Sequence, residues 1–342
     1  MNDMGGHDVR IWEKFQLGNV TFQSRIVMAP MVPFGITQEE NGALSEAGIR
    51  HYTVRAQEGL GLMISQALAV SDKAAMNGGA GAFSDAHIPG LRAVADACHE
   101  KDIRFFAQLS YPGPGYGNGG SIMDFSEDDL RVIGADFVRA ARRCADAGCD
   151  GVELHGAHSY FLNMLASSVA NRRTDAYGGD LDGRLRLVAE IVEGIRGFAG
   201  PDFIVSYRMG WTRDLEGDAE TARALVARGI DLLHVSSGIP SDRPAFRPAE
   251  FPYGEITYAG ARVKKNVDVP VTVVGGIATL NRGNALVEDG LCDFVAYGKP
   301  FLADGAFVTH SRADGDAKPC LTCRPCKWFE NGSLCPARRK RK

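Results

Sequence analysis

The stretch VMAPMVPFG, residues 27–35, decides between the two parallel α/β folds that the rest of the chain allows. The two folds are a closed barrel and an open, doubly wound sheet. The stretch includes the end of the first apolar run, and it lacks the glycine fingerprint that usually follows the first strand of a doubly wound sheet. Eight short apolar runs lie along the chain, at 25–29, 62–69, 104–109, 151–155, 204–208, 232–236, 271–274 and 294–297. They predict eight buried strands.

Longer segments with a helical period separate these runs, at 45–58, 90–101, 127–147, 183–197, 218–228 and 279–289. The strands are continuous apolar runs, which is typical of a parallel sheet covered by helices. Repeated strand-then-helix units indicate an α/β protein with a (β/α)8 TIM barrel. We expect the barrel to span 1–313 and a short cysteine-rich metal-binding extension to span 314–342. The active site of a barrel lies at the carboxyl ends of its strands.

Composition excludes several classes of protein. The 342 residues suit a single barrel, and a formal net charge of −4 gives no bulk attraction to nucleic acid. The first residues lack a secretory signal pattern, and no run of 18 apolar residues occurs. We therefore expect a cytoplasmic protein bound neither to a membrane nor to nucleic acid. The basic end ARRKRK is interpreted as a solvated tail.

Three ring side chains lie at the end of the fourth predicted strand in the motif HGAHSY, residues 155–160. His155 and His158 could both donate hydrogen bonds to one carbonyl oxygen and stabilise the negative charge that develops there. The phenol of Tyr160 could then supply a proton to a nearby carbon. The alternatives are a pair of structural histidines or zinc ligands.

The last two predicted strands end in glycine pairs of the kind that hold phosphate in barrels. Gly275 and Gly276 follow one strand, and Gly298 and Lys299 follow the other. Backbone N–H groups approach a phosphate closely where no Cβ intervenes, and a cation neutralises it. A pair of tight turns is the alternative.

Two polar residues end the third and fifth predicted strands. The amide of Gln108 can both donate to and accept from a planar heterocycle, and the charge of Arg208 can stabilise an electron-rich ring. For each residue, a hydrogen-bonded or ion-paired place in the barrel wall is the competing interpretation.

These motifs together resemble the old yellow enzyme family of FMN-dependent barrels. The resemblance covers about residues 12–313, through SRIVMAPM, AQL and the long stretch from Glu153 to Leu187 that contains NRRTDAYGG. It implies an isoalloxazine ring lined by Pro30, Met31, Val32, Ala67, Gln108 and Arg208, with the phosphate at Gly275, Gly276, Gly298 and Lys299. It also implies that His155 and His158 bind the substrate carbonyl, that Tyr160 protonates the α-carbon, and that NADH or NADPH is the reductant.

Four positions depart from the common family pattern. Val32 cannot donate a hydrogen bond near the flavin, Phe34 and Tyr111 stand where relatives often carry tyrosine and histidine, and Lys299 replaces a frequent arginine. These changes bear on the substrate and on the reduction potential. Relatives are often dimers or larger, so the resemblance allows a homo-oligomer and leaves the oligomeric state open.

Four of the eight cysteines crowd into the end of the chain as C-x2-C-x2-C-x8-C: Cys320, Cys323, Cys326 and Cys335. In a reducing compartment such spacing suggests a metal site. It resembles the trimethylamine dehydrogenase and dienoyl-CoA reductase branch of the family, which implies a [4Fe–4S] cluster; a Zn site and free thiols are the alternatives. A cluster would allow an electron-transfer protein as partner.

Reduction of an activated C=C bond in an α,β-unsaturated carbonyl or conjugated acyl substrate is the function that we expect. The first alternative is an FMN/iron–sulfur dehydrogenase that runs in the oxidative direction, by desaturation or amine oxidation. No cysteine lies beside Met31 to anchor a covalent flavin, which disfavours amine oxidation. The second alternative is a zinc-stabilised barrel without enzymatic activity.

Overall fold

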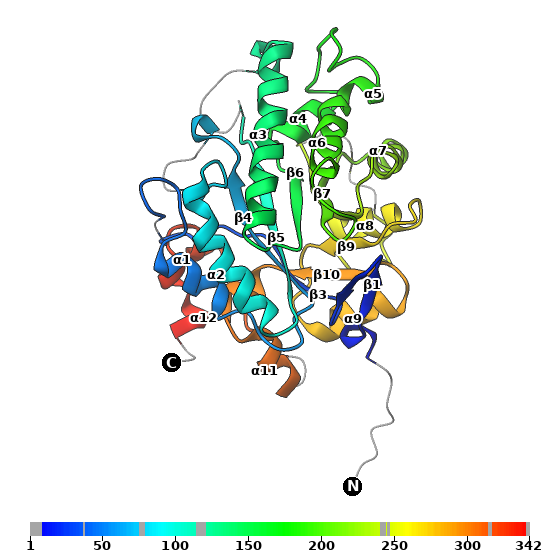
Figure 1. Ribbon diagram of the computed structural model, residues 1–342. Helices are drawn as coiled ribbons and strands as arrows, with labels where there is room; N and C mark the ends of the chain where they lie inside the picture. Colours follow the sequence, from blue (N-terminus) through cyan, green and yellow to red (C-terminus); the bar gives the residue numbers. More distant parts are fainter. Residues whose placement is uncertain are drawn as a thin grey trace.

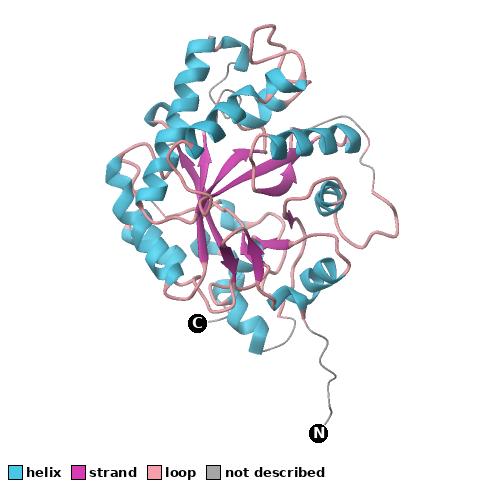
Figure 2. Ribbon diagram, turned by 45° about the vertical axis from the view of Figure 1, so that its right-hand side comes forward, coloured by secondary structure: helices cyan, strands magenta, loops and turns pink. Residues whose placement is uncertain are grey.

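Eight parallel strands close into a barrel in the computed structural model, which describes residues 9–36, 38–74, 79–113, 121–239, 244, 247–313 and 317–339. The strands are β3 (Ile26–Met28), β4 (Leu62–Ala69), β5 (Arg104–Ser110), β6 (Gly151–Gly156), β7 (Ile204–Trp211), β8 (Leu232–Ser237), β9 (Val271–Val274) and β10 (Phe294–Tyr297). Parallel pairing of β10 with β3 closes the ring. The predicted TIM barrel is therefore confirmed, with every strand at its predicted place (Figures 1 and 2).

Helices surround the strands on the outside (Figure 2). The longer ones are α1 (Glu46–Thr53), α2 (Ile88–His99), α3 (Glu127–Asp146), α6 (Arg186–Arg196), α7 (Leu215–Ala227), α8 (Glu255–Lys264) and α9 (Leu280–Glu288). The shorter ones are α4 (Phe161–Ala166), α5 (Leu181–Arg184), α10 (Lys299–Ala303), α11 (Phe307–Ala313) and α12 (Pro336–Arg339). No helix of the described residues is long and apolar enough to cross a membrane.

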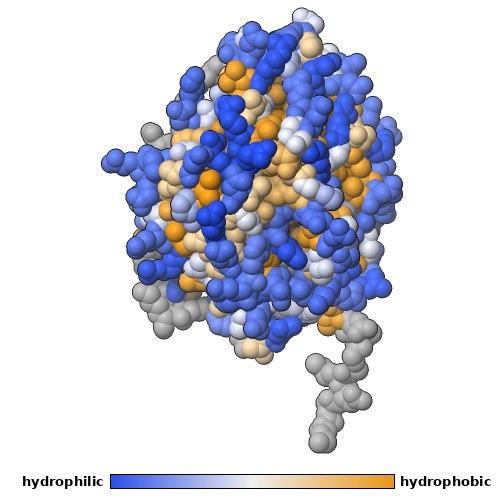
Figure 3. Space-filling view, viewed as in Figure 1, coloured by the Kyte–Doolittle hydropathy of each residue, from blue (hydrophilic) through white to orange (hydrophobic). Residues whose placement is uncertain are grey.

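Helix α3 shows why these segments form amphipathic helices. Ser126 caps its first turn by accepting from the backbone N–H of Asp129, whose carboxylate in turn accepts from the backbone N–H of Ser126. Apolar residues at helical spacing, among them Leu130, Ile133 and Phe137, are buried against the barrel. The outer face is charged, and the surface of this side of the molecule is mainly hydrophilic with apolar patches between (Figure 3).

The inside of the barrel changes from apolar to polar along its axis. Apolar side chains fill the half near the amino ends of the strands, including Leu62, Phe106, Ile204, Leu232 and Phe294. A hairpin of β1 (Phe15–Leu17) and β2 (Val20–Phe22) adds Phe22 to this layer, 5.0 Å between ring centroids from Phe294. Polar side chains gather instead at the carboxyl ends, which places the site there.

Several features of the fold differ from the sequence-based prediction, and two of them have a clear local reason. The helix predicted at 183–197 is divided into α5 and α6 at Leu185. The backbone of Leu185 is not helical, with φ −99° and ψ 3°. The β1–β2 hairpin was missed because its three-residue strands are too short to show a period.

The C-terminal segment, residues 317–339, packs against the loop after β3 and against α1. Trp328 is 2% exposed and donates from its indole Nε1 to the carbonyl oxygen of Val32 at 3.1 Å. The backbone N–H of Gly332 donates to the carbonyl oxygen of Phe34 at 2.7 Å. Residues 314–316, where we predicted the extension to begin, lie outside the described residues.

Candidate functional site

Polar side chains of four neighbouring strands meet inside the carboxyl half of the barrel. Gln108 on β5 pairs in register with Glu153 on β6, and His155 on β6 pairs with Arg208 on β7. His234 on β8 is the next register partner of Arg208. Because strand side chains alternate with a period of two, Glu153 and His155 share the interior face. All five are buried.

The histidines form a chain of hydrogen bonds rather than two parallel donors. Nε2 of His155 lies 2.9 Å from Nδ1 of His158, and Nε2 of His158 lies 2.8 Å from Oγ of Ser236. Arg208 donates from a terminal nitrogen to the same Oγ at 3.2 Å. Ser236 thus accepts from Arg208 and can donate to His158, which can donate to His155. This direction leaves an N–H at Nδ1 of His155, a buried atom with no hydrogen-bond partner among the described residues.

The turn that carries the second histidine has an unusual backbone. His158 and Ser159 have φ of 59° and 63°, in the left-handed region that residues with a Cβ seldom adopt. The backbone N–H of His158 donates to the carbonyl oxygen of Ser237 at 3.0 Å, which holds the turn against β8. Strain of this kind collects at functional sites.

Burial keeps both histidines neutral. It lowers the pKa of His155 well below the ordinary value, and the neighbouring charges of His158 and Arg208 add to the effect. Burial, followed by the charges of Arg208 and His234, lowers the pKa of His158 to about 3. Near neutral pH the two rings are therefore hydrogen-bond donors and acceptors without net charge.

Tyr160 completes the predicted constellation. It is the N-cap residue of α4 and is almost wholly buried. Its ring centroid lies 4.3 Å from that of His155. The structure therefore brings His155, His158 and Tyr160 together at one strand end, as the motif predicted.

The predicted phosphate residues lie at the ends of the adjacent strands β9 and β10. Gly275 and Gly276 have φ of 116° and 71°, which favour glycine, and a Cβ on Gly276 would meet nothing within 4 Å. Gly298 is the N-cap of α10, and Lys299 is exposed at its first position. An open glycine cradle next to an exposed cation fits a phosphate group.

The loop after β3 joins the two halves of the site. A Cβ on Gly298 would lie 2.7 Å from Sδ of Met31, so Met31 packs directly against the phosphate end. Pro30 is half-buried and Val32 is 45% exposed. Half-buried Ala67 follows a register shift between Ile64 and Ala67 in β4, a bulge of the kind that redirects side chains near active sites.

These donors fit a flavin nucleotide. The ring end would meet Gln108 and the positive charge of Arg208, whose Nε is buried without a partner among the described residues. The phosphate end would meet the glycine cradle and Lys299. Gln108 and Arg208 lie on β5 and β7, and the glycine pairs follow β9 and β10, so both ends belong to the mouth of one closed barrel.

The predicted metal centre finds no support in the structure. Cys320, Cys323, Cys326 and Cys335 are all among the described residues and are free and half-buried. No group of three or more histidine, cysteine, aspartate or glutamate side chains in the described part of the chain takes an arrangement that could hold a metal ion. The described residues therefore support neither the predicted [4Fe–4S] cluster nor its zinc alternative.

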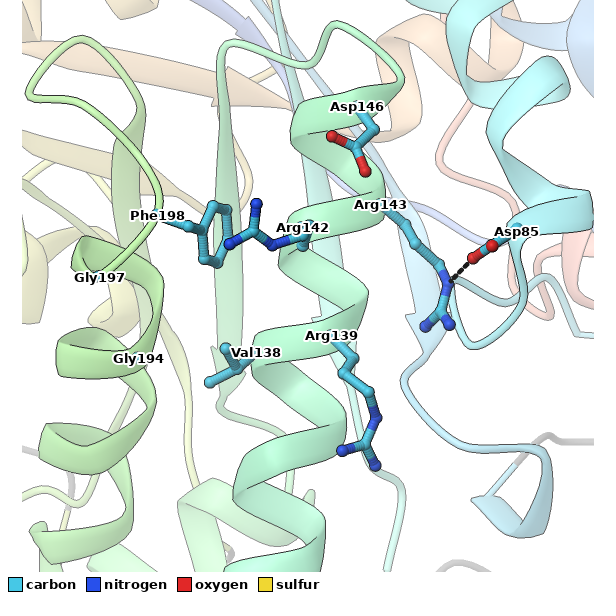
Figure 4. A pocket seen from close by; sticks show the side chains of 9 residues that line it. All are labelled: Asp85, Val138, Arg139, Arg142, Arg143, Asp146, Gly194, Gly197 and Phe198. Atoms are coloured by element: carbon cyan, nitrogen blue, oxygen red, sulfur yellow. Dashed lines mark hydrogen bonds and ion pairs between the residues drawn. The ribbon is translucent and has the colours of Figure 1, made fainter.

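A hollow of about 440 Å³ lies far from this mouth, between the last turns of α3 and α6 (Figure 4). Arg142 stacks over the ring of Phe198 at 4.1 Å, and Arg143 donates to Asp85 at 2.7 Å. Helices run antiparallel to the strands in a (β/α)8 barrel, so these helix ends lie near the amino ends of the strands. The hollow is therefore not the active site.

Sequence reasoning missed Glu153, His234 and Ser236 as parts of the site. Glu153 and His234 interrupt otherwise apolar strands, in GVELHG and LLHVSS, and each stands two positions before a polar residue of the mouth. An ionisable residue inside a buried strand is the signal that could have identified them.

A family model described as the NADH:flavin oxidoreductase / NADH oxidase family matches residues 10–118 and 119–314. The NADH oxidase of Thermoanaerobacter brockii is 29% identical to this chain, over 93% of the chain and 53% of that protein. A metal reductase of Desulforamulus reducens is 27% identical, over 90% and 50%. The chain thus spans about half the length of these two relatives. An NADPH dehydrogenase of Listeria innocua is 27% identical over 87% of the chain and 93% of its own length.

Two solved structures share the fold. A 2-naphthoyl-CoA reductase in complex with 2-naphthoyl-CoA superimposes with a TM-score of 0.81 at 22% identity, over 94% of this chain and 56% of that one. A morphinone reductase mutant in complex with tetrahydroNAD gives 0.73 at 24%, over 90% and 92%. At these identities the likeness shows the barrel alone, whereas the family model covers nearly the whole chain. The chain belongs to the NADH:flavin oxidoreductase / NADH oxidase family.

Proposed function

We propose that this protein reduces an activated C=C bond, as an FMN-dependent oxidoreductase that takes its electrons from NADH or NADPH. The observation that carries the proposal is the contact of His155 with Tyr160, at 4.3 Å between ring centroids, together with Nδ1 of His155, which has no hydrogen-bond partner among the described residues. A hydrogen-bond donor and a phenol side by side suit a substrate whose carbonyl oxygen must be held while a nearby carbon is protonated.

When bound, FMN would supply hydride chemistry from its reduced ring. The chain would hold the ring with Gln108 and Arg208, and the phosphate with the backbone of Gly276 and with Lys299. His155 would donate from Nδ1 to the substrate carbonyl, in the direction set by Arg208 and Ser236 through His158. Tyr160 would transfer its phenolic proton to the α-carbon. Burial of this cluster excludes water and strengthens each of these hydrogen bonds.

The oxidative direction is the second candidate. The same donors would stabilise an enolate formed by loss of a proton to Tyr160, so the cluster itself permits desaturation. That direction requires an acceptor for two electrons. Since the four C-terminal thiols do not gather, we propose no route through a metal cluster, and reduction by NAD(P)H remains the preferred direction.

The test uses Tyr160→Phe and measures two half-reactions separately: reduction of the protein by NAD(P)H and its reoxidation by an enone. Reoxidation of the reduced protein by an enone should slow about 10²–10⁴-fold, the usual contribution of a general acid, while reduction by NAD(P)H stays near the wild-type rate. Tyr177→Phe is the matched control, because Tyr177 is also a buried tyrosine, and its phenolic hydroxyl donates to the carboxylate of Glu190. Equal losses in both halves would remove Tyr160 from this role.

A further inference from the structure

Two ionisable side chains lie beneath the mouth with no exposed surface at all, and the mechanism above does not use them. Glu153 and His234 are 0% exposed, and Nδ1 of His234 lies 2.8 Å from Oε2 of Glu153. A carboxylate inside a protein is costly unless each of its oxygens is bonded. Both oxygens of Glu153 are bonded here, which indicates a built arrangement.

The other oxygen of Glu153 fixes the orientation of Gln108. Nε2 of Gln108 donates to Oε1 of Glu153 at 2.7 Å. A carboxylate only accepts hydrogen bonds, so the NH2 side of this amide must face Glu153. The carbonyl oxygen of Gln108 therefore points away from Glu153 and can accept a hydrogen bond from another group.

The charges around the pair are consistent with an ionised Glu153. Burial opposes ionisation, but the charge and hydrogen bond of His234, the charge of Arg208 and the hydrogen bond of Gln108 together lower the pKa of Glu153 below its ordinary value. Burial lowers the pKa of His234, although Glu153 opposes the shift. Because a carboxylate only accepts hydrogen bonds, Nδ1 of His234 carries the N–H that it donates to Oε2 of Glu153.

We propose that Glu153, held by His234, is a positioning residue of the flavin site. It presents the carbonyl oxygen of Gln108 to a ring N–H of the flavin, and its negative charge balances Arg208. The inference rests on the proposed function in one respect, that the isoalloxazine binds at this end of the barrel. Glu153 acts on the ring through Gln108 and Arg208 and does not touch it.

The experiment measures FMN affinity and the flavin midpoint potential in Glu153→Gln, a change that keeps shape and removes charge. The glutamine can offer its own NH2 to Gln108, so the Gln108 amide is free to turn over. We expect FMN to bind the apoprotein on the order of tenfold more weakly, as for a lost hydrogen bond to a charged group. The midpoint potential should rise, because an unbalanced Arg208 stabilises the electron-rich reduced ring.

A double-mutant cycle tests whether Glu153 affects FMN binding through Gln108. If Glu153 acts through Gln108, Glu153→Gln should not weaken FMN binding further in a Gln108→Leu background. Ser206→Ala is the matched control, because Ser206 is buried in the same barrel interior, is the register partner of Glu153, and has a hydroxyl without a partner among the described residues. It should change neither quantity.

Each outcome decides a different point. Wild-type protein that binds no FMN overturns both the proposed function and this inference. Wild-type protein that binds FMN, with Glu153→Gln unchanged in affinity and potential, overturns the inference alone. If Glu153→Gln does not fold, His234→Asn replaces it, since asparagine keeps an N–H donor but is too short to hold Glu153 in the same place. Unchanged FMN affinity and potential in that variant would overturn the inference equally.

Discussion

Replacement of Trp328 by alanine should release the C-terminal segment, residues 317–339, from the barrel. The indole is 2% exposed, donates to the carbonyl oxygen of Val32 at 3.1 Å, and lies with its ring centroid 6.3 Å from that of His51 on α1. Truncation of a buried tryptophan costs about 3–5 kcal/mol. Even the lower figure raises the population of the detached segment about a hundredfold, since each 1.4 kcal/mol is about a factor of ten.

Trypsin reports this detachment at one peptide bond. Lys318 and Arg324 each precede a proline, where trypsin does not cut, and Arg338 and Arg339 lie at the very end of the segment, so the bond after Lys327 is the informative internal one. Cleavage tracks the open population when opening and closing are fast compared with cutting. The cleavage rate should therefore rise about a hundredfold in Trp328→Ala.

The neighbouring ring provides the control. Phe329 is 63% exposed, and Phe329→Ala should leave cleavage after Lys327 near the wild-type rate. A Trp328→Ala protein that is cut no faster than wild type would refute the reasoning, because the segment would then be held by contacts other than the indole. Loss of the far-ultraviolet circular dichroism of the whole protein would refute it too, since the barrel would then depend on the segment.

Two further predictions concern titration and thiol chemistry. Burial, with the charges of Arg55 and Arg338, lowers the pKa of His51 to about 2, so between that value and the unfolded value of 6.5 only the unfolded chain takes up this proton. The free energy of unfolding should therefore fall as pH drops below 6.5, by up to about 1.4 kcal/mol per pH unit for this group. Urea unfolding between pH 7.5 and 5 should show a shallower dependence of this free energy on pH in His51→Phe than in wild type. Equal dependence in the two proteins would contradict the assignment. A thiol reagent should modify four cysteines quickly in the folded protein, with or without a chelator, and four more only after denaturation, because Cys98, Cys144, Cys149 and Cys292 are buried and burial raises the pKa of Cys98 to about 12. Fast thiols that appear only after chelation would restore the metal site.

The strand pattern of the barrel was readable from sequence because each strand is a short continuous apolar run that a parallel sheet buries on both faces. β4, β9 and β10 begin and end where the runs do. Helix ends were less accurate, as at α1, which ends at Thr53 although the helical pattern continues to residue 58. Helix ends depend on caps and on the turn that follows, which carry little periodic signal.

Local motifs also indicated which residues lie near one another in the mouth. HGAHSY holds its three rings within six residues at a strand end, so no long-range information was needed to group His155, His158 and Tyr160. The glycine pairs were equally local. What the motifs could not give was the direction of the bonds, because the link from His158 to Ser236 spans 78 positions along the chain.

The cysteine spacing shows the opposite case. The pattern of Cys320, Cys323, Cys326 and Cys335 allowed a cluster, zinc or free thiols, and only the three-dimensional structure showed them as free cysteines with no metal-holding group among the described residues. The hydrophobic period and the strand-end motifs are local properties, so they were enough to predict the barrel and the residue types at its mouth. Tertiary structure alone decided which atoms pair, as between Glu153, Gln108 and His234, because those contacts join three strands 45 and 81 positions apart in the chain.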